Sequence, residues 1–296
     1  MFSSRALKWI VGLPVAIVAL LVAVAWYFSS LVLYPPVHCN LDHHVYCGNP
    51  SEIGLAFEDV QIPTSDGLKM QSWYIPAERS TKAIVMVHGH GGLKNEGLRF
   101  ARVLHDAGYN LLLLDLRRNS GGSATMGYLE SRDVIRALDF LSTEKKNEKL
   151  GIFGFSMGAA TSILSMSADQ RIRAGLFSSG YASAVDVLSE AAARDYHLPY
   201  YPLFPVMLFV GDHRAHIELE AVRPVDVIGG ISPRPISIFH CDKDDYVDSS
   251  HAQRLFAAAR EPKEVWTPKC DRHERIWNTH REEAERRAVA FFKKNL

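Results

Sequence analysis

The residues Gly154-Phe155-Ser156-Met157-Gly158 decide how this chain is interpreted. The apolar run at 149–153 before them is typical of a strand, and residues 159–164 after them favour a helix. A serine between two glycines at such a strand-to-helix turn is a nucleophile elbow. The turn is so tight that a β-carbon on either glycine would clash, and the serine is held in a strained conformation. We expect the Ser156 hydroxyl to stand clear of the sheet, beside the positive end of the following helix.

Apolar runs of strand length recur on both sides of the elbow and predict a sheet. They lie at residues 83–87, 111–114, 149–153, 172–177, 236–239 and 263–266. A hairpin of residues 57–62 and 68–75 leads into them, and helical patterns separate most of them, the last at about residues 281–293. Strands that alternate with helices predict an α/β fold with a mainly parallel central sheet and helices on both faces.

One connection is too long for a plain crossover, because nearly sixty residues separate the strands that end at Phe177 and begin at Ile236. We expect an inserted lid at about residues 180–232, since long insertions at the carboxyl edge of a parallel sheet usually form lids or binding walls. Residues 198–209 are rich in Tyr, Phe, Leu and Pro, and would form an apolar surface over the serine. The alternative is a helical insertion that packs as ordinary core.

The N-terminal residues 9–33 carry no charge and are almost entirely apolar. As a helix they would extend over about 37 Å, enough to cross a bilayer. We interpret them as an uncleaved signal-anchor, because the apolar run continues past Ala23-Val24-Ala25, which resembles the cleavage site of a signal peptide. Arg5 and Lys8 precede the span, so the positive-inside rule keeps residues 1–8 in the cytoplasm. The bulk of the chain then lies on the non-cytoplasmic side, which is the periplasm in a bacterium.

A linker, residues 34–56, follows the span and contains Cys39 and Cys47. In an oxidising compartment these two cysteines could form a local disulfide. The alternative is a metal site, although the spacing matches no finger pattern. Its further ligands would be His38, His43 and His44. Cys241 and Cys270 each follow a predicted strand and are either paired or simply buried.

A serine hydroxyl is a poor nucleophile at neutral pH and needs a general base within hydrogen-bond reach. The base in turn needs a carboxylate that orients it. In a sheet of this type the three residues follow the chain order Ser, then Asp or Glu, then His. The acid and the base are therefore expected after the strands at 236–239 and 263–266. The first of these strands is followed by four carboxylates, those of Asp242, Asp244, Asp245 and Asp248.

Several features together resemble the α/β-hydrolase fold: the elbow, the pair His88-Gly89 after one buried strand, Asp115 after the next, and residues 240–247. They particularly resemble its membrane-anchored serine hydrolases with a short N-terminal helix, a group that includes esterases and thioesterases. The resemblance covers the expected hydrolase domain, residues 57–296. The span and the cysteine-containing linker lie outside it.

In that group a strand end that reads H-G-x-x-D-x-x-V carries the catalytic acid, and His240, Asp244 and Val247 match it. The resemblance therefore implies Asp244 as the acid, with Asp242 as the second choice. Cys241 stands where glycine is usual, so the resemblance does not define the conformation of the local turn.

The resembling proteins hold their base histidine in the loop between the last strand and the C-terminal helix. His273 lies in that loop and is implied as the base, with His280, nearer the helix, as the alternative. His251 is expected in the helix after the acid's loop and is interpreted as structural. Because the chain has 13 histidines, order and loop position decide among them rather than residue type.

A tetrahedral intermediate needs backbone N–H donors that already point at its oxyanion. One donor is expected at Met157, the residue after the serine, and the resemblance implies His90 as the other. The glycines of residues 88–92 let this loop approach a substrate closely. A phosphate-binding loop is the alternative, but the segment has neither G-x-G-x-x-G nor the Walker lysine. His88 and Asp115 are expected to shape the loop.

The expected function is hydrolysis of a carboxylic ester or thioester by Ser156, His273 and Asp244, through an acyl-enzyme and with no metal or organic cofactor. The expected substrate is a small-molecule or lipid-like acyl ester, and the N-terminal helix is expected to bind the membrane. Basic and acidic residues balance at 33 each, so nucleic acid is not an expected partner. Two alternatives stay open: a peptidase, amidase or acyltransferase on the same triad, and an inactive membrane-tethered binding protein.

Overall fold

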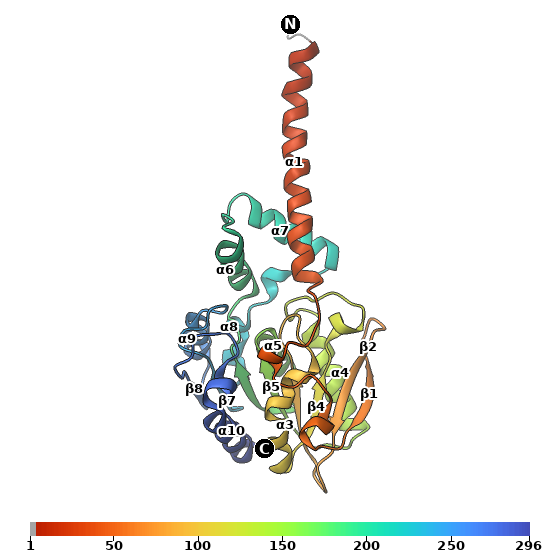
Figure 1. Ribbon diagram of the computed structural model, residues 1–296, viewed down its shortest axis with the longest axis vertical. Coiled ribbons are helices and arrows are strands. Elements are labelled where there is room, and N and C mark those ends of the chain that lie inside the picture. Colours follow the sequence, from red (N-terminus) through yellow and green to blue (C-terminus); the bar gives the residue numbers. More distant parts are fainter. Residues whose placement is uncertain (1–3) are drawn as a thin grey trace.

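Eight strands form one mixed sheet in this protein, whose computed structural model describes residues 4–296 (Figure 1). Their order in space is β1-β2-β4-β3-β5-β6-β7-β8. Strand β2 pairs antiparallel with β1 and with β4, and the other pairs are parallel. The strands are β1 (Glu58–Pro63), β2 (Lys69–Ile75), β3 (Lys82–Val87), β4 (Asn110–Leu114), β5 (Lys149–Phe155), β6 (Ile172–Ser178), β7 (Ile236–Phe239) and β8 (Lys263–Trp266). The predicted mainly parallel sheet, entered through a hairpin, is confirmed.

Alternate residues of the central strands enter two separate apolar cores, because successive side chains of a strand point to opposite faces. In β3, Val85 and Val87 belong to one core, whereas Ile84 and Met86 belong to the other. Helices cover both cores, as predicted. They are α4 (Glu130–Thr143), α5 (Met157–Ala168) and α9 (Ser249–Ala258) on the first side, and α3 (Leu98–Asp106) and α10 (Ile276–Asn295) on the second.

An insertion, residues 179–235, separates β6 from β7 where the sequence predicts one. Its two longer helices lie beside the last turns of the N-terminal helix, at the side of the sheet domain from which that helix projects (Figure 1). They are α6 (Ala184–Tyr196) and α7 (Leu203–Ala215), followed by η4 (Leu219–Ala221), α8 (Pro224–Val227) and η5 (Ile228–Ile231).

The N-terminal helix α1 (Ser4–Leu33) projects from the domain, and its last turns pack against α7 (Figure 1). Ala25, Ser29 and Leu33 are buried at intervals of four residues, so one stripe of the helix faces the protein. The preceding turns are exposed from Gly12 onward. Within the described residues, Gly12–Leu33 is the one stretch long and apolar enough to cross a membrane, a property that signal sequences and core helices share.

The linker 34–56 carries two short helices, α2 (Leu41–His44) and η1 (Pro50–Ile53). It closes on itself through a disulfide between Cys39 and Cys47. Neither sulfur is therefore free as a thiolate ligand. In the described part of the chain, no group of three or more His, Cys, Asp or Glu side chains is arranged to hold a metal ion.

Candidate active site

Ser156 lies at the turn between β5 and α5, with backbone angles φ 52° and ψ −118°. A positive φ is strained for a residue with a β-carbon. The turn leaves no room on either side. A β-carbon on Gly154 would overlap the carbonyl group of Gly158, and one on Gly158 would overlap the carbonyl oxygen of Val87. The steric reason that the sequence suggests for both glycines is confirmed.

Three residues from distant segments meet at this turn. The hydroxyl of Ser156 donates to Nε2 of His273 at 2.8 Å. Nδ1 of His273 donates to Asp244, at 2.8 Å to Oδ2 and 3.0 Å to Oδ1. His273 comes from the loop after β8 and Asp244 from the loop after β7. The arrangement has the geometry that a general base needs to take a proton from the serine. Its catalytic role stays a prediction.

The carboxylate of Asp244 is fixed by its own loop. Its Oδ1 accepts hydrogen bonds from the backbone N–H groups of Tyr246 at 3.0 Å and Val247 at 2.9 Å. Asp242, the second choice from the sequence, instead accepts from the backbone N–H of Cys270 at 2.9 Å. Asp242 therefore ties two loops together, and Asp244 is the carboxylate that contacts the histidine.

A disulfide between Cys241 and Cys270 joins the same two loops. Cys241 stands three residues before Asp244, and Cys270 stands three residues before His273. The cysteine that replaces the usual glycine thus has a structural explanation. It cross-links the segment that carries the carboxylate to the segment that carries the imidazole.

The other candidate histidines have partners elsewhere. His280 lies at a kink in α10 and bonds the carbonyl oxygen of Lys269 at 2.9 Å. His251 accepts the backbone N–H of Ala182 at 3.0 Å and bonds Glu190 through Nε2. The interpretation of His251 as structural agrees with these contacts.

The loop after β3 is shaped by the side chains expected to do so. His88 donates from Nδ1 to the carbonyl oxygen of Gly89 at 2.7 Å, and its Nε2 accepts the N–H of Leu116 at 3.0 Å. Asp115 accepts the N–H of Lys94 at 2.9 Å. His90 and Met157, the predicted oxyanion donors, both line the cavity that Ser156 lines. Their role as backbone donors stays a prediction.

Sequence reasoning missed a buried charged network beneath the elbow, formed by Glu96, Arg99 and Glu274, which we call the Glu–Arg–Glu network. Arg99 contacts Glu96 at 3.0 Å and Glu274 at 3.4 Å, and all three side chains are almost fully buried. Glu96 accepts the N–H of Gly89 at 2.7 Å. Glu274 accepts the N–H of Ser156 at 3.2 Å. The network therefore connects the elbow, the loop after β3 and the residue that follows His273.

Charges around the imidazole shift its titration. Burial alone would lower the pKa of His273, but the hydrogen bond and charge of Asp244, helped by Glu274 and Glu96, raise this pKa above its ordinary value. Burial raises the pKa of Asp244, but its contacts with His273 and the charge of His240 hold that pKa below its usual range. Both shifts favour the charged pair. This is the state that forms when an imidazole takes a proton from a serine.

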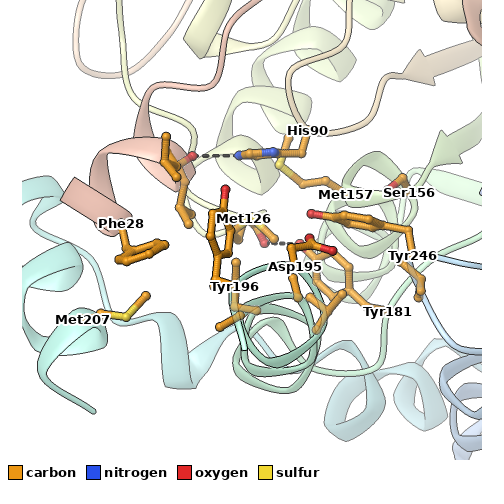
Figure 2. A pocket seen from close by; sticks show the side chains of 17 residues that line it. Phe28, His90, Met126, Ser156, Met157, Tyr181, Asp195, Tyr196, Met207 and Tyr246 are labelled. Atoms are coloured by element: carbon orange, nitrogen blue, oxygen red, sulfur yellow. Dashed lines mark hydrogen bonds between the residues drawn. The ribbon is translucent and has the colours of Figure 1, made fainter. Parts of the chain in front are cut away.

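Two cavities meet at the serine. The first, of about 210 Å³, we call the apolar cavity, and it extends from Ser156 towards α1, α6 and α7 (Figure 2). The second, of about 480 Å³, we call the polar recess. It lies between the linker, residues 89–92 and His273. His90, Ser156 and Tyr246 line both, so a molecule at the serine can extend in two directions.

No family model matches the chain. It is similar to an uncharacterised protein of Mycobacterium tuberculosis, with 32% identity over 217 residues that cover 70% of this chain and 69% of the relative. The uncharacterised protein YqkD of Bacillus subtilis is 26% identical over 295 residues, 95% of each chain. The alpha/beta hydrolase domain-containing protein WAV2 of Arabidopsis thaliana is 26% identical over 270 residues, covering 85% of this chain and 81% of WAV2.

Solved structures share the fold. An esterase of Pyrococcus furiosus matches with a TM-score of 0.72 and 22% identity, over 89% of this chain and 98% of the esterase. An acylaminoacyl peptidase of Pyrococcus horikoshii matches with a TM-score of 0.63 and 15% identity, over 84% of this chain and 44% of the peptidase. At these identities the likeness concerns the fold alone.

Proposed function

We propose that this chain, which has the α/β-hydrolase fold, is a serine hydrolase that cleaves a carboxylic ester or thioester. The observation that carries the proposal is the continuous hydrogen-bond chain from Ser156 through His273 to Asp244. The strained elbow that exposes the hydroxyl to the cavities supports it as well.

In the proposed reaction, Ser156 Oγ attacks the acyl carbon while His273 Nε2 takes the hydroxyl proton. The backbone N–H groups of His90 and Met157 stabilise the oxyanion of the tetrahedral intermediate. When the intermediate collapses, His273 returns the proton to the leaving oxygen or sulfur, and the acyl group stays on the serine. Water then attacks the acyl-enzyme by the same steps, which releases a carboxylic acid and restores the serine. Asp244 holds the imidazole in the required tautomer throughout.

One observation favours an ester or thioester over a peptide. The apolar cavity beside Ser156 suits an acyl chain, because its walls offer mostly hydrocarbon surface.

We also propose a membrane-anchored arrangement, with residues 1–8 in the cytoplasm, a span at 9–33, a linker at 34–56 and the hydrolase domain at 57–296 outside the cytoplasm. The basic residues before the span support this orientation. Two disulfides support it independently, because disulfides persist in oxidising compartments. Protease added to sealed spheroplasts of a bacterial host should digest the domain. A domain that resists the protease in sealed spheroplasts but is digested once detergent opens the membrane would contradict the orientation.

The reaction class is tested with two substrates that differ in one atom, p-nitrophenyl butyrate and butyryl p-nitroanilide. The full-length enzyme in detergent should hydrolyse the ester with a kcat/KM far above that for the anilide. Ser156→Ala should remove this activity, whereas Ser167→Ala, a matched serine substitution further along α5, should retain it. Comparable turnover of the anilide would indicate an amidase or peptidase. A folded wild-type protein that cleaves neither compound would indicate a binding protein.

A further inference from the structure

We propose that α1 is a wall of the acyl-binding site as well as an anchor. The substrate class that this predicts is an amphiphilic ester, with its acyl chain between α1 and the insertion and its polar leaving group in the polar recess. The inference rests on the proposed hydrolase function and adds to it the side chains that select the acyl group.

The first observation is the lining of the apolar cavity. Phe28, Leu31 and Val32 of α1 line it together with side chains of α6 and α7. Figure 2 shows Phe28 and Met207 at the opposite end of the cavity from Ser156. The cavity's volume of about 210 Å³ is many times the roughly 10–15 Å³ that a single water needs. An acyl chain attached to the serine would therefore end against a side chain of the N-terminal helix.

The second observation is that the insertion holds α1 through specific polar contacts. Arg214, at the end of α7, donates from Nη1 to the carbonyl oxygen of Trp26 at 2.8 Å and to the hydroxyl groups of Ser29 at 2.7 Å and Ser30 at 2.8 Å. Its guanidinium also lies 3.8 Å from the centre of the Trp26 ring. Phe28 meets Tyr196 of α6 edge to face, with ring centres 4.8 Å apart. These contacts fix the register of α1 against the cavity.

The third observation is a direct link between α1 and the loop that is proposed to bind the oxyanion. Nε2 of His90 donates to the carbonyl oxygen of Val32 at 2.7 Å (Figure 2). Burial lowers the pKa of His90, and the neutral imidazole donates this bond as the tautomer that carries its hydrogen on Nε2. The carbonyl oxygen of Leu33 accepts the N–H of Ala124 at 2.8 Å. The end of α1 is thus bonded to two loops of the sheet domain.

The fourth observation concerns depth in the membrane. From Trp9 to Val24 there are 16 residues, about 24 Å of helix, and Ala25, which follows, is the first buried residue among the side chains described from Gly12 onward. The hydrocarbon core is about 30 Å thick. A spanning α1 therefore brings its docked turns, and the insertion packed on them, to the bilayer surface. Exposed aromatic side chains gather at this level, as expected of an interface. They are Trp26, Tyr27, Tyr201 and Phe209.

The other side of the serine differs in the side chains that line it. The polar recess is lined by His38, Asn40 and His44 of the linker and by Asp245 of the acid loop, in addition to hydrocarbon surface. A polar alcohol or thiol would find hydrogen-bonding groups there. The two cavities together fit a molecule with one apolar and one polar end.

The test measures how kcat/KM depends on acyl length, with p-nitrophenyl esters from acetate to laurate and the full-length enzyme in detergent micelles. Val32→Trp fills part of the apolar cavity and should lower the laurate-to-acetate ratio of kcat/KM about tenfold or more. Phe28→Ala opens the far end and should move the preferred acyl length upward. Val18→Trp and Tyr27→Ala make the same changes at exposed positions of α1 and should keep the wild-type profile.

Labelling of Ser156 by a fluorophosphonate reports in parallel whether each variant keeps an intact site. A wild-type enzyme that is labelled and active, with Val32→Trp and Phe28→Ala profiles that superimpose on its own, would overturn the inference and leave the proposed function intact. A folded wild-type protein that is neither labelled nor active on any chain length would overturn the proposed function and the inference with it. The two substitutions are expected to shift the preferred acyl length in opposite directions. A loss of stability in either variant could not produce both shifts.

Discussion

The two sides of Ser156 are held in place by different kinds of interaction. Beneath the serine, the Glu–Arg–Glu network is buried and hydrogen-bonded to the backbone of the elbow and of the loop after β3. Towards α1, the apolar cavity is enclosed by hydrocarbon and aromatic side chains of α1 and the insertion. Arg214 and His90 supply polar contacts that tie α1 to the rest of the protein.

This difference predicts which substitutions change the reaction rate and which change substrate specificity. A buried charge that loses its partner is strongly destabilising, so the polar side should tolerate few substitutions. An apolar wall tolerates changes of side-chain volume at moderate cost. Substitutions below the serine should therefore alter rate and pH dependence for every substrate, whereas substitutions on α1 should alter the ranking of substrates.

The largest effect is expected from Asp244→Asn, which removes the carboxylate that contacts the imidazole of His273. The amide cannot hold the imidazole in the tautomer that accepts the serine proton, so kcat should fall by about 10⁴-fold. Acetate and laurate esters should lose activity equally. A loss confined to long chains would mean that Asp244 acts on substrate fit rather than on the imidazole.

The pH profile of the same variant gives a second check. His273 is active only when neutral, so wild-type kcat/KM should rise with pH through a midpoint above the ordinary imidazole pKa. Asp244→Asn removes the main cause that raises the pKa of His273, while burial continues to lower it. The midpoint should therefore move to lower pH. An unchanged or higher midpoint in residual activity would contradict the assignment of the carboxylate.

An intermediate effect is expected from Glu274→Gln. The substitution keeps the shape of the side chain but removes a negative charge beside His273 and weakens the hydrogen bond from the backbone N–H of Ser156. We expect kcat/KM to fall about tenfold for all esters, with a smaller downward shift of the pH midpoint than in Asp244→Asn. Glu282→Gln removes a charge from the exposed surface of α10 and is the matched control. Equal effects of the two variants would rule out a specific role of the network.

Much of the fold could be predicted from the sequence because most of the central strands are short apolar runs bounded by turns. The β3 run at 83–87 is buried along its whole length, as a strand covered on both faces must be. The start of α10 was harder to define, since the helix begins at Ile276 rather than at about residue 281 and contains a kink at His280 that its apolar spacing does not reveal. Order along the chain predicts which loops carry the acid and the base, and the resemblance to the α/β-hydrolase fold selects Asp244 and His273 within them.

Two parts of the site could not be predicted, for physical reasons. Glu96 and Arg99 stand three residues apart, a spacing that surface ion pairs on helices use as well, so their burial leaves no trace in the pattern. The last turns of α1 are apolar whether lipid or protein covers them, and the sequence does not reveal that α7 packs there. Arg214, the residue that fixes this contact, is one of 33 basic residues and has no distinguishing neighbour.

The most direct test of the account is mass spectrometry of the full-length protein after reaction with a fluorophosphonate. The account predicts one adduct per chain, mapped to the peptide that contains Ser156, with formation that slows as His273 becomes protonated and no adduct in Ser156→Ala. A folded wild-type protein that stays unmodified, or an adduct on another residue that persists in Ser156→Ala, would contradict it.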